Sequence, residues 1–209
     1  GKLSWYESFR IIMLWEFTSA ITPSAVGGTS FAIIYVHKGG LNVGRSSAIV
    51  LLTSFFDELY FIVMFPLLVI LLGWHTIFDV AGASPALRES ITLFLIVGYS
   101  LKFIYTLFVS YGLFINPRGL KWIIVGIFRL RWLRRWRKSA AKAGDDIIES
   151  SRALNAKPFG FWIKVFASTF LSWSSRYLVV NALLLAFFAF GDHLLLFARQ
   201  LVMWIMMLV

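Results

Sequence analysis

The chain has 209 residues, of which 59% are hydrophobic and only 14% are charged, and its mean hydropathy is +0.80. These values exclude an ordinary soluble globular domain and predict an integral membrane protein with no room for a separate soluble catalytic domain. The absence of cysteine excludes disulfides and Cys-based metal or nucleophile chemistry, and no G-x-x-x-x-G-K-[ST] sequence is present to form an ATP-driven motor.

The first apolar region is interrupted by a break rich in Pro and Gly. Its two arms, 9–21 and 31–36, are each too short to cross a bilayer, and Pro23 with Gly27-Gly28 lies between them. Two short arms joined by a break predict either a re-entrant hairpin or one discontinuous crossing over 1–42. Lys2 and Arg10 favour the hairpin, because basic residues tend to stay on the cytoplasmic side.

Three longer apolar stretches follow, at 46–72, 89–115 and 159–190. The first reaches roughly 40 Å as a helix, which is enough for a tilted crossing. A fourth stretch, 194–209, reaches only roughly 24 Å, so we expect it to begin a further span in a fragment of a longer protein. The sequence therefore predicts an all-α fold: a polytopic transmembrane helix bundle with a re-entrant or broken N-terminal helical hairpin, in a single domain over 1–209.

The segment 118–142 is basic and also rich in Trp. It contains nine Lys and Arg residues and no acid, which predicts a cytoplasmic location. Its apolar residues predict one amphipathic helix at the inner membrane surface, with anionic phospholipid as its partner. The net charge of +10 is therefore interpreted as favouring the membrane surface rather than nucleic acid. A polar connector is expected over 144–157. The loops 73–88 and 191–193 are expected on the outer side.

An acidic pair, Asp57-Glu58, lies in the middle of the stretch 46–72. At 100° per residue the two acids share an arc of roughly 140° with four hydroxyl residues, Ser46, Ser47, Thr53 and Ser54. This polar face is expected to line an inward-opening cavity or, alternatively, to hold a structural pair that neighbouring helices satisfy.

Two cations at similar depth balance the acids. Lys102 lies near the centre of 89–115, and Arg176 lies on a polar face of 159–190 that also carries Lys164, Ser168, Ser172 and Ser175. An unpaired charge at the bilayer centre costs roughly 2.5–3.5 kcal/mol, so at least one acid is expected within ion-pair distance of Lys102 or Arg176. An arginine on a serine-lined face also suits a lipid phosphate.

The break itself is a candidate anion site, because main-chain N–H groups at the start of a half-helix attract negative charge. A simple loop, or a close-packing site for the glycines, is the alternative. Glu16 is a further acid in an apolar setting, and the three histidines show no ligand spacing, so neither a metal nor a cofactor is predicted. The substrate-binding candidates are therefore Glu16, Thr22, Pro23, Ser24, Gly27, Gly28, Thr29, Asp57, Glu58, Lys102 and Arg176.

Several runs of residues resemble the flippase-like family, which comprises the transmembrane region of lysylphosphatidylglycerol synthases and their stand-alone relatives in bacterial inner membranes. The runs are W-E-F-T-S-A-I-T-P-S-A-V-G-G-T-S at 15–30, L-L-T-S-F-F-D-E at 51–58, W-S-S-R-Y-L at 173–178 and R-Q-L-V-M-W at 199–204. The resemblance implies a multi-pass membrane protein of the bacterial inner membrane. It does not imply enzymatic activity, because the aminoacyl-transferring domain of the bifunctional synthases is absent from the sequence.

We therefore expect the protein to bind a lipid or lipid-linked molecule and to move it between leaflets. Two alternatives are an enzyme acting on a lipid head group, with Asp57 or Glu58 as the acid/base, and a membrane scaffold that transports nothing. The enzyme lacks a candidate nucleophile or metal site. The lipid, the energy coupling and the oligomeric state, a homo-oligomer included, are left open by the sequence.

Overall fold

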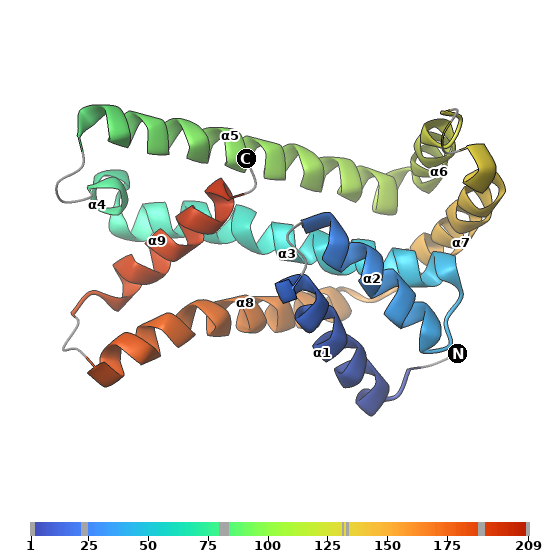
Figure 1. Cartoon of the computed structure of the whole chain (residues 1–209), viewed down its shortest axis with the longest axis horizontal. Helices are drawn as coiled ribbons and strands as arrows, with labels where there is room; N and C mark the ends of the chain where they lie inside the picture. Colours follow the sequence, from blue (N-terminus) through green and yellow to red (C-terminus); the bar gives the residue numbers. More distant parts are fainter. Residues whose placement is uncertain are drawn as a thin grey trace. The chain divides into compact units, whose positions relative to one another are not determined.

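A computed structural model describes residues 3–21, 25–79, 84–130, 132, 134–187 and 191–207, without the side chains of 25–30 and 143. Over these residues the chain forms helices and no strands, which confirms the predicted all-α fold (Figure 1). The chain divides into two compact units. The first comprises Gly1–Ser54 and Val109–Lys157, and the second comprises Phe55–Phe108 and Pro158–Val209.

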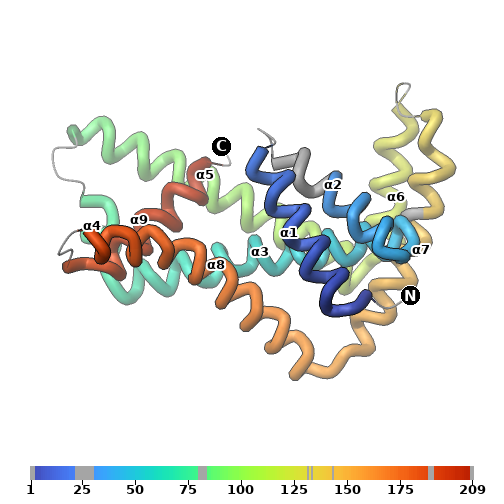
Figure 2. Tube along the Cα trace, turned by 60° about the horizontal axis from the view of Figure 1, so that its bottom comes forward, coloured from blue at the N-terminus to red at the C-terminus, as the bar shows by residue number. Residues whose placement is uncertain are grey.

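The first unit contains a helical hairpin, α1 (Trp5–Ile21) and α2 (Ala25–Lys38), whose two helices lie side by side in Figure 2. A reciprocal pair of hydrogen bonds begins α1: the Ser4 N–H donates to Glu7 Oε2 at 2.8 Å, and the Glu7 N–H donates to Ser4 Oγ at 3.2 Å. Buried residues Ile11, Ala32 and Val36 form the centre of the hairpin. The predicted N-terminal helical hairpin is therefore confirmed.

The basic segment is not the single helix predicted over 118–142. Helix α6 (Pro117–Ile127) is followed by turns and a short 3-10 helix, η2 (Arg134–Trp136), and then by α7 (Arg137–Asn155), which packs against α6. The segment 144–157, expected as a polar connector, is mostly helical, because most of it belongs to α7. A continuous helix would stack arginines at spacings of three and four residues with no acid between them, which is unfavourable.

Folding back brings an acid of α7 to a cation of α6. Lys121 Nζ lies 2.6 Å from Asp145 Oδ1. At the C-terminal end of α7, Asn155 Nδ2 donates to the Phe114 carbonyl at 3.1 Å, within the π-helical turn η1 (Tyr111–Ile115). Asn116 then caps α6 by accepting a 2.8 Å hydrogen bond from the Gly119 N–H. These polar contacts hold α6, α7 and η1 together.

Helix α3 (Val43–Leu72) begins in the first unit and continues into the second, which also contains α4 (Trp74–Phe78), most of α5 (Pro85–Ser110), α8 (Phe159–Phe187) and α9 (His193–Met206). Among the described residues, three helical segments are long and apolar enough to cross a membrane: Val43–Leu72, Pro85–Ile115 and Phe159–Phe187. They coincide with the three predicted spans in position, although the first two begin several residues earlier than predicted.

Helix α4 was not predicted, because it lies in the expected loop 73–88. Gly73, whose φ is 81°, ends α3 in the left-handed region that glycine adopts without strain, and α4 follows immediately. The core of the second unit is a continuous apolar cluster of α3, α4, α5 and α9 residues, including Tyr60, Phe61, Phe65, Ile77, Leu95, Leu201 and Ile205.

Candidate functional site

The second unit contains a buried ion pair between two of its spanning helices. Lys102 Nζ of α5 lies 2.6 Å from Glu58 Oε2 of α3, and the two side chains are 3% and 20% exposed. The same ammonium lies 4.6 Å from the centre of the Phe61 ring, an added favourable contact for a desolvated cation. The prediction that a mid-span acid lies within ion-pair distance of Lys102 or Arg176 is confirmed by Glu58.

The second acid, Asp57, has an aromatic partner. The indole N–H of Trp173, on α8, donates a 2.8 Å hydrogen bond to Asp57 Oδ1. The guanidinium of Arg176, one helical turn further along α8, lies 4.7 Å from the centre of the Trp173 ring. Trp173 therefore contacts both an acid and a cation, and it connects Asp57 to Arg176 through one indole.

Aromatic side chains surround these charges. Trp173 stacks on Tyr60 with 6.3 Å between ring centres, meets Phe61 edge-on at 4.9 Å, and approaches Trp204 of α9 at 5.7 Å. The Tyr60 hydroxyl is 3.2 Å from Ser174 Oγ. Sequence reasoning did not single out Trp173, because a Trp in an apolar helix is usually a packing residue. The signal that identifies it is its position directly before the serines and Arg176 of the polar face.

The predicted hydroxyl stripe on α3 is satisfied largely within its own helix. Ser46 Oγ donates to the Asn42 carbonyl at 2.8 Å and Ser47 Oγ to the Val43 carbonyl at 2.9 Å. Thr53 Oγ1 donates to the Ile49 carbonyl at 3.0 Å. These hydroxyls need no cavity to complete their hydrogen bonding, so the stripe by itself is not evidence for a pathway.

The candidate residues of the break belong to the first unit. Thr22, Pro23 and Ser24 lie outside the described residues. Gly27, Gly28 and Thr29 are helical and lie within the first two turns of α2, so the break is shorter than the predicted segment 22–29. Glu16 is exposed on α1. Of the predicted site residues, the structure brings together Asp57, Glu58, Lys102 and Arg176, which all belong to the second unit.

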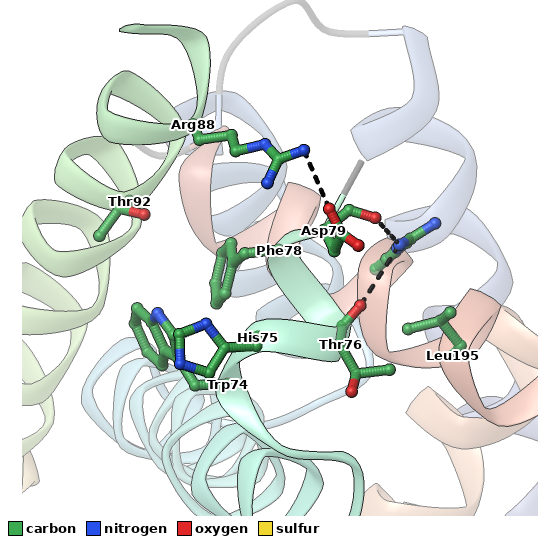
Figure 3. Close-up of a pocket in the computed structure, with 9 residues that line it drawn as sticks. Trp74, His75, Thr76, Phe78, Asp79, Arg88, Thr92 and Leu195 are labelled. Atoms are coloured by element: carbon green, nitrogen blue, oxygen red, sulfur yellow. Dashed lines mark hydrogen bonds and ion pairs between the residues drawn. The ribbon is translucent and has the colours of Figure 1, made fainter. Parts of the chain in front are cut away.

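A pocket of about 650 Å³ lies at one end of the second unit (Figure 3). It is roughly 20 Å along α3 from Glu58, given a rise of 1.5 Å per residue. Its lining comes from α4, the start of α5 and α9, and comprises Trp74, His75, Thr76, Phe78, Asp79, Arg88, Thr92, Leu195 and Arg199. Sequence reasoning missed this pocket, because Arg199 lies 120 residues from Asp79 and only the helix packing brings them together.

Two arginines organise the pocket around Asp79. Arg88 Nη2 lies 2.9 Å from Asp79 Oδ1, as Figure 3 shows. Arg199 Nη2 donates to the main-chain oxygens of Asp79 at 2.8 Å and Thr76 at 3.3 Å. Its Nε donates to the Ile77 carbonyl at 3.2 Å. Arg199 thus supplies donors to carbonyls at the end of the short helix α4, which no intrahelical donor can satisfy.

Comparison with known proteins agrees with this architecture. The family described as "Lysylphosphatidylglycerol synthase TM region" matches residues 1–209. A UPF0104 membrane protein of Archaeoglobus fulgidus is 28% identical over 219 aligned residues, which cover all of this chain and 61% of the relative. The chain thus spans about three fifths of the length of this curated relative. No solved structure matches this chain. The resemblance found in the sequence is confirmed, and the chain belongs to the lysylphosphatidylglycerol synthase transmembrane-region family of membrane proteins.

Proposed function

We propose that this membrane protein moves a lipid or a lipid-linked molecule from one leaflet to the other. The observation that carries the proposal is the set of charges midway along the spanning helices: the Glu58–Lys102 pair and the Asp57–Trp173–Arg176 contacts. Charged side chains at membrane depth are costly, and they usually mark a substrate or ion pathway.

The proposed mechanism is an exchange of partners. A head group with a phosphate and an amine offers the same two charges as the Glu58–Lys102 pair, so Lys102 can bind the phosphate while Glu58 binds the amine. Arg176, which is exposed on α8, supplies a guanidinium as the second cation for the phosphate. Since each protein charge then has a partner both before and after exchange, the head group avoids crossing the apolar layer unpaired.

The N-terminal hairpin contributes a second part of this proposal. The first N–H groups of α2 lack intrahelical acceptors, and the glycines at 27 and 28 permit close approach of a head group. We propose transport rather than catalysis, because the charges are surrounded by aromatic side chains and the sequence has no cysteine to act as a nucleophile beside them.

We also propose that the α6–α7 region faces the cytoplasm and binds anionic phospholipid, in the membrane that bounds the cytoplasm. Trp132 is highly exposed, and the Arg135 guanidinium lies 4.6 Å from the centre of the exposed Trp136 ring. Exposed Trp beside Arg suits the interface between head groups and acyl chains.

A leaflet-resolved assay tests the transport proposal. The purified protein is reconstituted into liposomes that contain fluorescently labelled lipids with anionic, zwitterionic or amino-modified head groups, and a membrane-impermeant quencher reports the label in the outer leaflet. The protein is expected to accelerate movement of at least one lipid over empty liposomes. Glu58→Gln and Lys102→Met are expected to abolish that acceleration, whereas Glu149→Gln, which changes an exposed acid of α7, should preserve it. A rate equal to that of empty liposomes across the panel would contradict the proposal.

A further inference from the structure

The pocket between α4, α5 and α9 carries an excess of positive charge. Its lining includes the guanidiniums of Arg88 and Arg199 and the carboxylate of Asp79, so its formal charge is +1 with His75 neutral. The three main-chain hydrogen bonds of Arg199 use its Nε and Nη2 and do not use Nη1. Arg88 meets Asp79 through Nη2. Both guanidiniums therefore retain N–H groups for an anion.

The Arg88–Asp79 pair is the part of this pocket that an incoming ligand can change. The two side chains are 46% and 69% exposed, so their mutual attraction is screened by water and weak. Arg199, in contrast, is held by three main-chain carbonyls and stays in place. A phosphate can take the place of the Asp79 carboxylate on Arg88 while Arg199 remains fixed beside it. Guanidinium groups favour phosphate because their N–H groups match its oxygens in pairs.

Apolar side chains at the same end of the unit indicate what carries the phosphate. Trp74 and Phe78 line the pocket, with 4.5 Å between their ring centres. Ile70 and Leu71, in the last turn of α3, and Leu87, in the first turn of α5, are exposed. A free phosphate gains nothing from these surfaces, whereas a lipid can place its phosphate in the pocket and its chains along the exposed apolar turns. A volume of about 650 Å³ is within the usual range for small-molecule sites.

We propose that this pocket is a binding site for the phosphate group of a membrane lipid, with Arg88 and Arg199 as its ligands and Asp79 as an internal competitor for Arg88. The site is separate from the mid-helix charges, and equilibrium binding to it does not require transport. Its failure is therefore distinguishable from failure of the transport proposal.

Binding of short-chain lipids to the purified protein in detergent, measured by calorimetry, tests the site. The probes are dihexanoyl phosphatidic acid, dihexanoylglycerol, which lacks the phosphate, and inorganic phosphate, which lacks the chains. The first is expected to bind at least tenfold more tightly than either of the others. Equal binding of dihexanoylglycerol would overturn the role of the phosphate, and equal binding of inorganic phosphate would overturn the assignment to a lipid.

Two substitutions on the same ion pair are expected to act in opposite directions. Arg88→Gln should weaken the binding of dihexanoyl phosphatidic acid about tenfold, because it removes a charge-assisted contact. Asp79→Asn should strengthen it several-fold, because it releases Arg88 and removes a negative charge. Lys38→Gln, which removes an exposed cation of α2, is the control for net charge and should change nothing. If the Arg88–Asp79 pair has only a structural role, both substitutions should weaken binding or neither should. Either result would overturn the proposal.

Discussion

The hydroxyl of Tyr99 donates a 3.1 Å hydrogen bond to the main-chain oxygen of Ile62. Pro66 lies four residues after Ile62, inside α3, and has no N–H to complete the helical hydrogen bond to that oxygen. The Tyr99 hydroxyl of α5 thus supplies the hydrogen-bond donor that the backbone of α3 lacks. In an apolar surrounding, an unsatisfied carbonyl is costly, so this contact fixes the two helices to each other at one defined position.

Substituting Tyr99→Phe is expected to lower the free energy of unfolding by about 1 kcal/mol, the usual size of such a hydrogen bond. Unfolding of the purified protein in detergent measures it. In a Pro66→Ala background the alanine N–H restores the helical bond to Ile62, so the same Tyr99→Phe change should then cost less. An equal cost in both backgrounds would show that Tyr99 acts through packing alone.

Lys102→Met is expected to destabilise the protein by about 3 kcal/mol, because it leaves the Glu58 carboxylate without its cation in a largely buried place. We expect the lower end of the range for broken buried pairs, since Glu58 is 20% exposed. The double variant Glu58→Gln with Lys102→Met should recover most of the loss. Thermal unfolding of the three proteins in one detergent measures this, and a double variant no more stable than Lys102→Met would contradict the pairing.

Trp173→Phe retains an aromatic ring but removes the N–H that donates to Asp57. A hydrogen bond to a charged group contributes about 1.5–3 kcal/mol, so we expect a loss of stability in that range. Asp57→Asn should make the Trp173→Phe change less costly, since an amide oxygen is a weaker acceptor than a carboxylate. A double-mutant cycle measures the coupling between the two residues, and zero coupling would exclude the hydrogen bond as the cause.

Gly44 and Gly126 are a test position and a control position for the packing of the first unit. A Cβ on Gly44 would overlap the side chain of Asp146, whereas a Cβ on Gly126 meets nothing within 4 Å. Gly44→Ala is therefore expected to destabilise the contact of α3 with α7 by about 1–3 kcal/mol. Gly126→Ala should be neutral or stabilising by up to about 1 kcal/mol, because alanine is the better helix former. Equal effects of the two substitutions on the unfolding temperature would contradict this packing.

The proposed lipid partner of the α6–α7 region is tested by native mass spectrometry of the protein extracted from membranes of mixed composition. Replacing Arg134, Arg135 and Arg137 together with Gln should reduce the retained anionic phospholipid by about two orders of magnitude, because each basic residue near the surface contributes about 1 kcal/mol. Retention of neutral phospholipid should not change. Unaltered retention of the anionic lipid would place its binding site elsewhere.

The approximate bounds of the three long apolar helices among the described residues followed from the sequence alone. A bilayer allows few solutions for a long apolar stretch, so the positions of the helices Val43–Leu72, Pro85–Ile115 and Phe159–Phe187 were predictable to within several residues. The presence of a mid-span ion pair was predictable for the same reason, because an unpaired charge at that depth is unfavourable.

The choice of partners was decided only by the tertiary structure. The sequence contains two acids and two cations at similar depth. Helix packing pairs Lys102 with Glu58 as an ion pair and places the Trp173 N–H in a hydrogen bond with Asp57. The sequence also could not predict that α7 packs against α6 or that Arg199 contacts α4. Both depend on contacts between residues far apart in the chain, here 24 residues for Lys121–Asp145 and 120 for Arg199–Asp79. Local hydropathy and charge fix where a helix lies along the chain, but the rotation and approach of two packed helices determine which side chains meet.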